Sequence, residues 1–168
     1  HLDGLPDEAI AAAYEIIARC ALDVGKEEDA YAYLIKGTAL KSSSDALWAL
    51  RFEVETYQKK YDAAVSTLES LAKTRKSAVR MLRREQIGAL NRGIEYSKDK
   101  ALQIRFLQTV IAPDFVPASP FWQRDYFRFE LAALYKDAGR VEEAAALVGQ
   151  IDDPDILIMA GLDPRFRA

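Results

Sequence analysis

Apolar residues recur every three or four positions along most of this chain, the spacing that places them on one face of an α-helix. The first such pattern opens at Pro6 and Asp7 and continues from Ile10 to Val24, where Gly25 ends it. Further patterns follow to the end of the chain. Together they predict an all-α chain with helices over residues 7–24, 30–40, 45–57, 64–71, 77–94, 101–111, 121–138, 142–151 and 154–160.

The segment Leu134–Ile151 has the composition of two helices joined by a tight turn. Gly139 is expected just past the end of the first helix, because glycine takes the left-handed conformation without a Cβ penalty. Glu142 and Glu143 then fall in the first turn of the second helix, where the helix dipole favours acidic side chains. This segment is therefore predicted to be an antiparallel helical hairpin.

Two other segments share this design. Gly25–Ala30 reads GKEEDA and Lys60–Ala64 reads KYDAA, and in both segments the last alanine is followed four residues later by leucine. These two alanines lie 34 residues apart, and helix–turn–helix units at that period are typical of tetratricopeptide repeats. With Gly139–Ala144 as a further copy, the chain resembles a tetratricopeptide or tetratricopeptide-like helical repeat protein. Its DPRF ending is similar to chain ends that follow bacterial repeat regions.

The resemblance implies a right-handed α-α superhelix of antiparallel helical hairpins, about three to four in number and followed by a C-terminal capping helix. They would form one domain over residues 1–168. Aligned on the repeated alanine, the repeats would cover about 11–44, 45–78, 79–111 and 119–151, with the cap and tail at 153–168. Ala144 follows Ala64 by 80 residues, which is two periods plus 12. The proline-containing segment Ala112–Ser119 is predicted to supply most of this insertion.

The composition offers little for catalysis. His1 is the only histidine and stands at the chain terminus, so histidine-dependent acid–base chemistry and histidine-ligated zinc are not expected. Cys20 is the only cysteine, which rules out an internal disulfide, and its apolar neighbours predict a small buried core residue. The formal net charge of −3 points neither to nucleic acid nor to a membrane surface, and no apolar run is long enough to span a bilayer. We therefore expect a protein that is not an enzyme and that has no cofactor and no metal.

In the family that the chain resembles, the first helix of each repeat lines a concave groove. In this chain the groove would contain arginine and aromatic side chains. Such a surface suits a peptide, because arginine pairs with carboxylates and aromatic side chains supply contact area. The partner is expected to bind where Arg80 and Arg83 meet Tyr126 and Phe129. Trp122 and these two aromatic residues are alternatively explained as side chains that pack against a neighbouring helix. Carried onto this sequence, the resemblance implies partner-binding residues at Glu15, Arg19, Glu53, Tyr57, Arg80, Arg83, Trp122, Tyr126 and Phe129.

These observations predict a non-enzymatic scaffold or adaptor domain that binds a peptide or a partner protein in its concave groove. The alternative is a regulatory or sensor domain of a larger bacterial protein, which binds a small ligand or forms a homodimer. The basic segment Lys73–Arg84 is interpreted first as a solvated face, and nucleic acid binding through it is the lesser alternative. The cytoplasm is the favoured compartment, and the periplasm stays open if an anchor or signal was removed.

Overall fold

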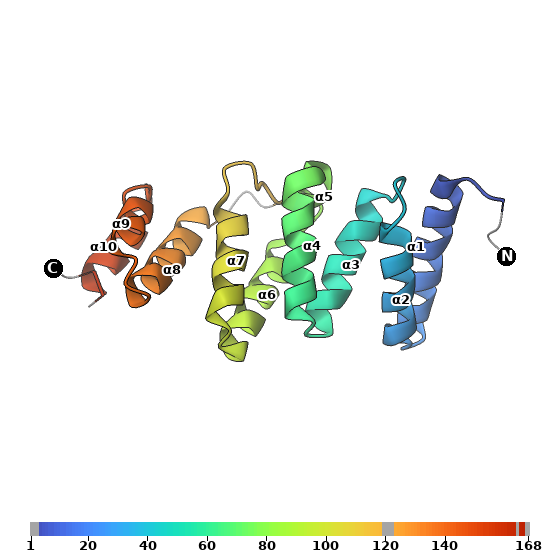
Figure 1. The fold of residues 1–168 in the computed structure, drawn as a ribbon, viewed down its shortest axis with the longest axis horizontal. Helices are drawn as coiled ribbons and strands as arrows, with labels where there is room; N and C mark the ends of the chain where they lie inside the picture. Colours follow the sequence, from blue (N-terminus) through green and yellow to red (C-terminus); the bar gives the residue numbers. More distant parts are fainter. Residues whose placement is uncertain (1–3, 119–122, 164, 167–168) are drawn as a thin grey trace.

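The computed structural model describes residues 4–118, 123–163, 165 and 166. These residues form ten helices and no strand, which confirms the prediction of an all-α chain. The helices follow one another along the long axis of an elongated molecule, from α1 at one end to α10 at the other (Figure 1). Their bounds are α1 Asp7–Asp23, α2 Glu27–Thr38, α3 Asp45–Tyr57, α4 Tyr61–Thr74, α5 Lys76–Val79, α6 Arg84–Ser97, α7 Lys100–Ile111, α8 Arg124–Asp137, α9 Val141–Val148 and α10 Pro154–Leu162.

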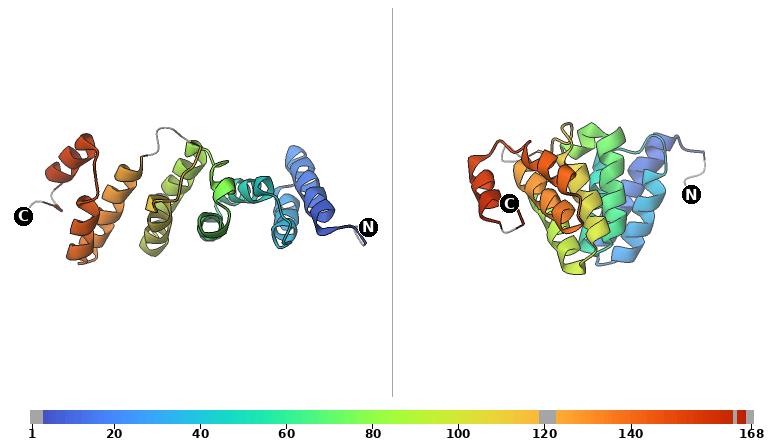
Figure 2. Two further views of the ribbon diagram at one scale, coloured as in Figure 1. Left: turned by 90° about the horizontal axis from the view of Figure 1, so that it is seen from above. Right: turned by 60° about the vertical axis from the view of Figure 1, so that its left-hand side comes forward.

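Neighbouring helices pack in pairs along this array. α1 packs on α2, α3 on α4, α6 on α7 and α8 on α9. Successive pairs contact each other through α2 and α3, through α4 and α7, and through α7 and α8. Seen from above, α4 and α7 lie on one side of the array and α3 and α6 on the other (Figure 2). The molecule is elongated because each pair of helices contacts mainly its neighbours in the chain.

Three of the turns between paired helices have the same backbone geometry. Gly25, Lys59 and Gly139 all take the left-handed conformation, with φ angles of 72°, 59° and 76°. A left-handed residue followed by a hydrogen bond that reaches back five residues is the Schellman helix ending. The three segments that the sequence marked as related therefore have the same local structure. The hydrogen bonds run from the backbone N–H of Lys26, Lys60 and Arg140 to the carbonyl oxygens of Ala21, Glu55 and Tyr135, each at 2.8 Å.

Each of these turns leads into a helix whose repeated alanine is buried. Ala30, Ala64 and Ala144 are 0%, 0% and 1% exposed. A small side chain at this place lets the second helix of a pair approach its neighbours closely. Gly37 serves the same purpose, since a Cβ there would lie 2.7 Å from Cδ2 of Leu47. Close packing therefore explains a glycine that is unfavourable for helix propensity.

The predicted single helix over residues 77–94 is wrong. The chain forms the short α5 and then α6, with a break over residues 80–83. On either side of Arg80, Val79 and Leu82 both enter the core and are 1% and 0% exposed. The backbone N–H of Arg83 donates to the side-chain oxygen of Gln86 at 2.9 Å, which supports the new helix start. The free energy gained by burying Val79 and Leu82 therefore outweighs the free energy of continuing the helix through residues 80–83.

The helix predicted over residues 121–138 begins later than expected. Gln123 has non-helical φ and ψ angles of −88° and 56°, and α8 starts at Arg124. The Arg124 side chain donates to the carbonyl oxygen of Phe115 at 3.0 Å, so the helix start is tied to the preceding connection. Residues 119–122, which include the predicted partner-binding residue Trp122, lie outside the described residues.

The hydrophobic core runs along the array in three clusters. The largest joins α3 to α9 and fully buries Phe52 and Phe106. A second lies around Leu34 and Leu47 near α1. A third lies around Phe129, between α8 and α10. The predicted capping helix α10 thus covers one face of α8, while its own outer face stays exposed.

Cys20 is exposed, so the prediction that it is a buried core residue is wrong. It lies on α1, the first helix of the array, and no described helix covers the face of α1 that points away from α2 (Figure 1). Ile16 and Val24, one helical turn to either side of Cys20, are 63% and 69% exposed. The apolar pattern of α1 is broader than the face that α2 buries.

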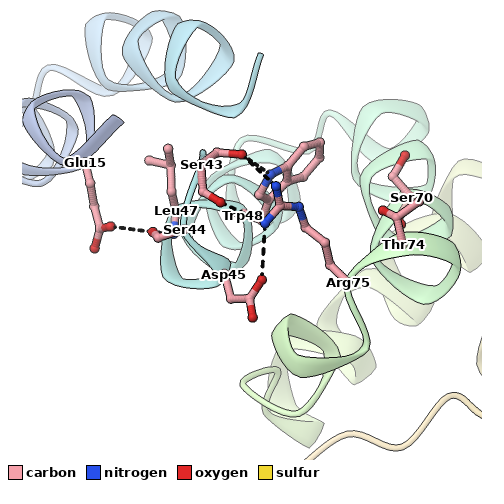
Figure 3. A network of polar contacts seen from close by, with 9 residues as sticks. All are labelled: Glu15, Ser43, Ser44, Asp45, Leu47, Trp48, Ser70, Thr74 and Arg75. Carbon is pink, nitrogen blue, oxygen red and sulfur yellow. Dashed lines mark hydrogen bonds and ion pairs between the residues drawn. The ribbon is translucent and has the colours of Figure 1, made fainter. Parts of the chain in front are cut away.

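A polar clasp around Trp48 ties the loop before α3 to the end of α4 (Figure 3). The indole N–H of Trp48 donates to Oγ of Ser43 at 2.9 Å. Arg75 donates to the carbonyl oxygen of Ser43 at 2.8 Å and pairs with Asp45 at 3.3 Å. The guanidinium groups of Arg51 and Arg75 lie 5.4 and 5.5 Å from the centroid of the indole ring, within range of cation–π attraction.

Candidate functional site

Four clefts lie between helices along the array. The first, between α1 and α3, has a volume of about 280 Å³, and the second, between α3 and α6, about 370 Å³. The third, between α6 and α8, and the fourth, between α8 and α10, each have about 480 Å³. Volumes of this size admit side chains of a partner or a small ligand.

Neighbouring clefts share lining residues. Glu53 and Tyr57 line both the first and the second cleft. Glu85 lines the second and the third, and Gln123 and Tyr126 line the third and the fourth. The four clefts are therefore successive parts of one surface, which we call the groove and define by these five shared residues.

The first cleft combines an apolar wall with a charged rim. Leu50 and Val54 supply apolar surface, and Arg19 lies beside them. Arg19 donates to the carboxylate of Glu15 at 3.0 Å. Glu15 also accepts a hydrogen bond from Oγ of Ser44 at 2.9 Å (Figure 3), so it positions Arg19 and joins α1 to the start of α3.

The second cleft is dominated by an exposed aromatic side chain. Tyr57 is 76% exposed at the end of α3. Glu53, one turn earlier, pairs with Arg83 at 3.3 Å and so links α3 to the start of α6. An exposed tyrosine beside charged side chains offers apolar area and a hydroxyl to a partner at low cost in side-chain entropy.

The third cleft contains a pair of carboxyl groups. Glu95 lines it, and Glu130 on α8 lies next to Glu95. The side-chain amide of Asn91 donates to Glu95 at 3.1 Å and to Glu130 at 3.3 Å. Burial, together with the charge of Glu95, raises the pKa of Glu130 from 4.5 to about 7. Near neutral pH the pair is therefore poised between holding one proton and none.

Tyr126 lines the third cleft and lies next to Glu130. Burial and the charges of Glu130 and Glu95 raise the pKa of Tyr126 to about 12, so its hydroxyl stays protonated and hydrogen-bonds to Glu130. Arg84 and Arg92 also line this cleft, but neither forms a salt bridge with Glu95 or Glu130 among the described side chains.

The fourth cleft is built around Asp125. Its carboxylate accepts the backbone N–H groups of Asp152 and Asp153, both at 3.0 Å, and pairs with Arg128 at 2.6 Å. Burial acts against ionisation of Asp125, but these hydrogen bonds outweigh it and lower its pKa. The contacts fix the start of α10 against α8, so the role of Asp125 is structural.

Four of the predicted partner-binding residues line the groove, namely Arg19, Glu53, Tyr57 and Tyr126. Arg83 adjoins it through its salt bridge with Glu53. Two others, Glu15 and Arg80, line none of the four clefts described above. Arg80 falls outside because it lies in the break between α5 and α6, where the sequence predicted a helix.

Phe129 does not lie on the groove. It is only 8% exposed and packs with Ile151 and Ala160, and its ring centroid lies 5.9 Å from that of Phe166. The alternative explanation, packing against a neighbouring helix, thus describes its environment. A single site formed by Arg80, Arg83, Tyr126 and Phe129 does not occur, because Phe129 is in the core.

Sequence reasoning missed the carboxyl pair. Glu95 lies four residues after Asn91, and Glu130 four residues after Tyr126, so each occupies the same helix face as a groove position. That spacing is visible in the sequence. The proximity of α6 and α8, separated by a whole helix and an irregular connection, is not.

The described residues hold no cluster of three or more histidine, cysteine, aspartate or glutamate side chains that could bind a metal ion. Within the same part of the chain, no helix combines the length and the apolarity that a membrane span requires. Compared with protein-family models, with curated protein sequences and with solved structures, the chain gave no match. The resemblance to tetratricopeptide repeats rests on the turns and their spacing.

Proposed function

We propose that this chain is a non-enzymatic binding module whose helical pairs form a superhelix of the tetratricopeptide type and whose groove holds a segment of a partner protein. We thus propose both the superhelical arrangement of the helical pairs and the function of the chain. It is supported by the repeated Schellman turns and buried alanines, which recur at the same places in three helix pairs.

The observation that carries the function is the continuity of the groove. Four successive clefts along the array share Glu53, Tyr57, Glu85, Gln123 and Tyr126 between neighbours. A series of connected clefts suits a partner that is extended along the array, because successive side chains of a peptide can enter successive clefts. A compact small molecule would use one cleft and leave the others without a role.

The groove favours an amphipathic partner. Its first cleft exposes apolar surface between charged side chains, and the exposed ring of Tyr57 stands between the first two clefts. Tyrosine side chains in such positions often carry much of the binding free energy of an interface. We expect Tyr57 to be the main aromatic contact of the partner in this half of the groove.

The test is selection of peptides from a displayed random library on the immobilised chain, followed by fluorescence anisotropy with a selected peptide. Replacement Tyr57→Ala is expected to weaken binding by about tenfold, the effect of losing one aromatic contact. Tyr96→Ala is the matched control, since Tyr96 is also on the surface, at 85% exposed, but lines none of the four clefts. Its affinity should equal that of the unmodified chain.

Two outcomes would contradict the proposal. Selected peptides that bind equally well to the Tyr57→Ala and Tyr96→Ala variants would show that the groove is not the binding surface. A selection without any binding peptide, combined with a metabolite that raises the melting temperature, would favour the regulatory or sensor alternative, because a ligand that binds only the folded state stabilises it.

A further inference from the structure

The third cleft brings the carboxyl groups of Glu95 and Glu130 together. Glu95 and Glu130 both accept a hydrogen bond from the side-chain amide of Asn91, and Glu130 also accepts one from the hydroxyl of Tyr126. Among the described residues neither carboxyl group forms a salt bridge, although the acidic side chains Glu15, Glu53 and Glu69 each pair with an arginine. Two neighbouring carboxylates without a cation are unfavourable in a partly buried place.

Asn91 supplies an independent sign that a donor is missing. Its side chain lines the third cleft and is only 7% exposed. While its amide nitrogen binds the two carboxyl groups, its Oδ1 atom is buried and receives no hydrogen bond from any described residue. A buried acceptor without a donor is costly and is rare in folded proteins.

From this arrangement we propose that the third cleft binds a basic side chain of the partner segment, arginine or lysine, whose cation approaches Glu95 and Glu130 beside the ring of Tyr126. This inference rests on the proposed function, and it adds the chemistry of the partner. An arginine side chain supplies a positive charge and several N–H donors, which suit carboxylates and an amide oxygen. The aromatic ring favours a cation at its face.

In the free chain the proton on Glu130 removes the repulsion between the two carboxyl groups, as a bound cation would. When the basic side chain binds, both carboxyl groups become charged and the proton is released, so binding is expected to strengthen as the pH rises through about 7, the pKa of Glu130. The other charged or titratable groups that line the cleft are Arg84, Glu85, Arg92, Glu95 and Tyr126. Of the described lining residues none belongs to α7, α9 or α10, the other helices packed on α8.

The experiment uses a small probe in place of the unidentified partner. The chain labelled with ¹⁵N is titrated with N-acetylarginine N-methylamide and, separately, with the citrulline analogue, which has nearly the same shape but no charge. We expect saturable shifts of the amide signals around Asn91, Glu95 and Glu130 with the arginine probe. The citrulline probe should bind at least about tenfold more weakly, since it lacks the charge-assisted hydrogen bonds.

Two variants and a pH series sharpen the result. Glu95→Gln and Glu130→Gln should each abolish the preference for arginine over citrulline, whereas Glu142→Gln, at an exposed position of α9 outside the four clefts, should keep it. Arginine binding to the unmodified chain should be about tenfold weaker at pH 6 than at pH 8, because the fraction of Glu130 in the charged form changes by about that factor. The lysine analogue then tells whether an ammonium group suffices.

Equal binding of the arginine and citrulline probes, or shifts that persist unchanged in the Glu95→Gln and Glu130→Gln variants, would overturn the inference. The comparison with citrulline needs no variant, so a variant that fails to fold leaves the test intact. Selected peptides that bind through Tyr57 but show no arginine preference would leave the proposed function standing and refute only this site. If the arginine probe binds and no peptide does, the proposed function fails.

Discussion

Lys59 takes a backbone conformation that its residue type disfavours. It has a φ angle of 59°, and it stands where the two related turns have Gly25 and Gly139. A residue with a Cβ atom pays about 1 kcal/mol or more in the left-handed region, because the Cβ crowds the next carbonyl oxygen. The turn forms nevertheless, since the backbone hydrogen bond that closes it and the burial of Ala64 are retained.

Lys59→Gly is therefore expected to raise the free energy of unfolding by about 0.5–1 kcal/mol. The converse replacement, Gly139→Ala, should lower it by about 1 kcal/mol, because it introduces the same strain in an equivalent turn. Urea unfolding followed by circular dichroism measures both. A Lys59→Gly variant less stable than the unmodified chain would show that the lysine side chain makes a contact more valuable than the relief of strain.

Two glycines of α6 differ in what surrounds them. A Cβ on Gly93 would overlap the ring of Tyr61, which packs from α4. A Cβ on Gly88 would meet only the guanidinium end of Arg92, at 3.5 Å. Gly93 is therefore required by helix packing, whereas Gly88 is not.

Replacement by alanine separates these cases. Gly93→Ala should lower the free energy of unfolding by about 1–3 kcal/mol, the usual cost of an overpacked core position. Gly88→Ala, the matched control in the same helix, should leave stability unchanged or raise it by up to about 1 kcal/mol through helix propensity. Thermal unfolding of both variants provides the comparison, and similar effects of the two substitutions would contradict the packing of Tyr61 on α6.

At the scale of elements, the contact between α6 and α8 depends on pH. The folded chain holds a proton on Glu130 up to about pH 7, whereas an ordinary glutamate releases it near pH 4.5. Between these values the folded state binds more protons than the unfolded state. The contribution of Glu130 to stability is therefore expected to fall as the pH rises from about 4.5 to 7 and to be level above that range.

The expected loss between pH 5 and pH 8 is about 1–3 kcal/mol of unfolding free energy. Glu130→Gln should remove most of this slope and be more stable than the unmodified chain at pH 8, because it relieves the repulsion from Glu95 and keeps an acceptor for Asn91. Glu142→Gln, an exposed glutamate on α9, is the control that should retain the slope. Melting temperatures across the pH range test this, and an unchanged slope in Glu130→Gln would refute it.

The clasp around Trp48 fixes a second contact between elements. Arg75 binds Ser43 and Asp45 and lies against the indole ring, so one side chain holds the loop between α2 and α3 to the end of α4. Arg75→Ala should lower the free energy of unfolding by about 1–3 kcal/mol, the value of hydrogen bonds from a charged donor plus a cation–π contact.

Arg80→Ala is the matched control for Arg75→Ala. Arg80 lies in the same basic segment and is exposed, and its substitution should change the unfolding free energy by less than about 0.5 kcal/mol. Chemical denaturation of both variants distinguishes a structural arginine from a solvated one. Equal effects would mean that the clasp adds no stability.

For the whole molecule, the sequence could predict the helices and three of the turns. The starts of α3 and α10 follow from Ser44 and Asp153, whose side chains accept backbone N–H groups at 3.0 and 2.9 Å. The predicted helix over residues 77–94 failed because its periodicity hid the break in which Leu82 enters the core. Periodicity describes one element at a time, and it contains no information on a neighbour that makes a break favourable.

The candidate site could be predicted only in part for the same reason. Tyr57 and Glu53 were found because their helix face follows from the spacing of a recognisable repeat. Phe129 was assigned to the groove, but α10 returns over it and buries it. Cys20 was assigned to the core, but no described helix covers its face of α1 and it is exposed.

The sequence by itself determined the local structure, since propensity, capping and the left-handed turn residues act within a few residues of one another. It also determined the period at which buried alanines recur. Only the tertiary structure decided which helix faces are covered, because that depends on contacts between segments far apart in the chain. The approach of α6 to α8 places Glu95 beside Glu130, and with it the chemistry that the groove offers to a partner.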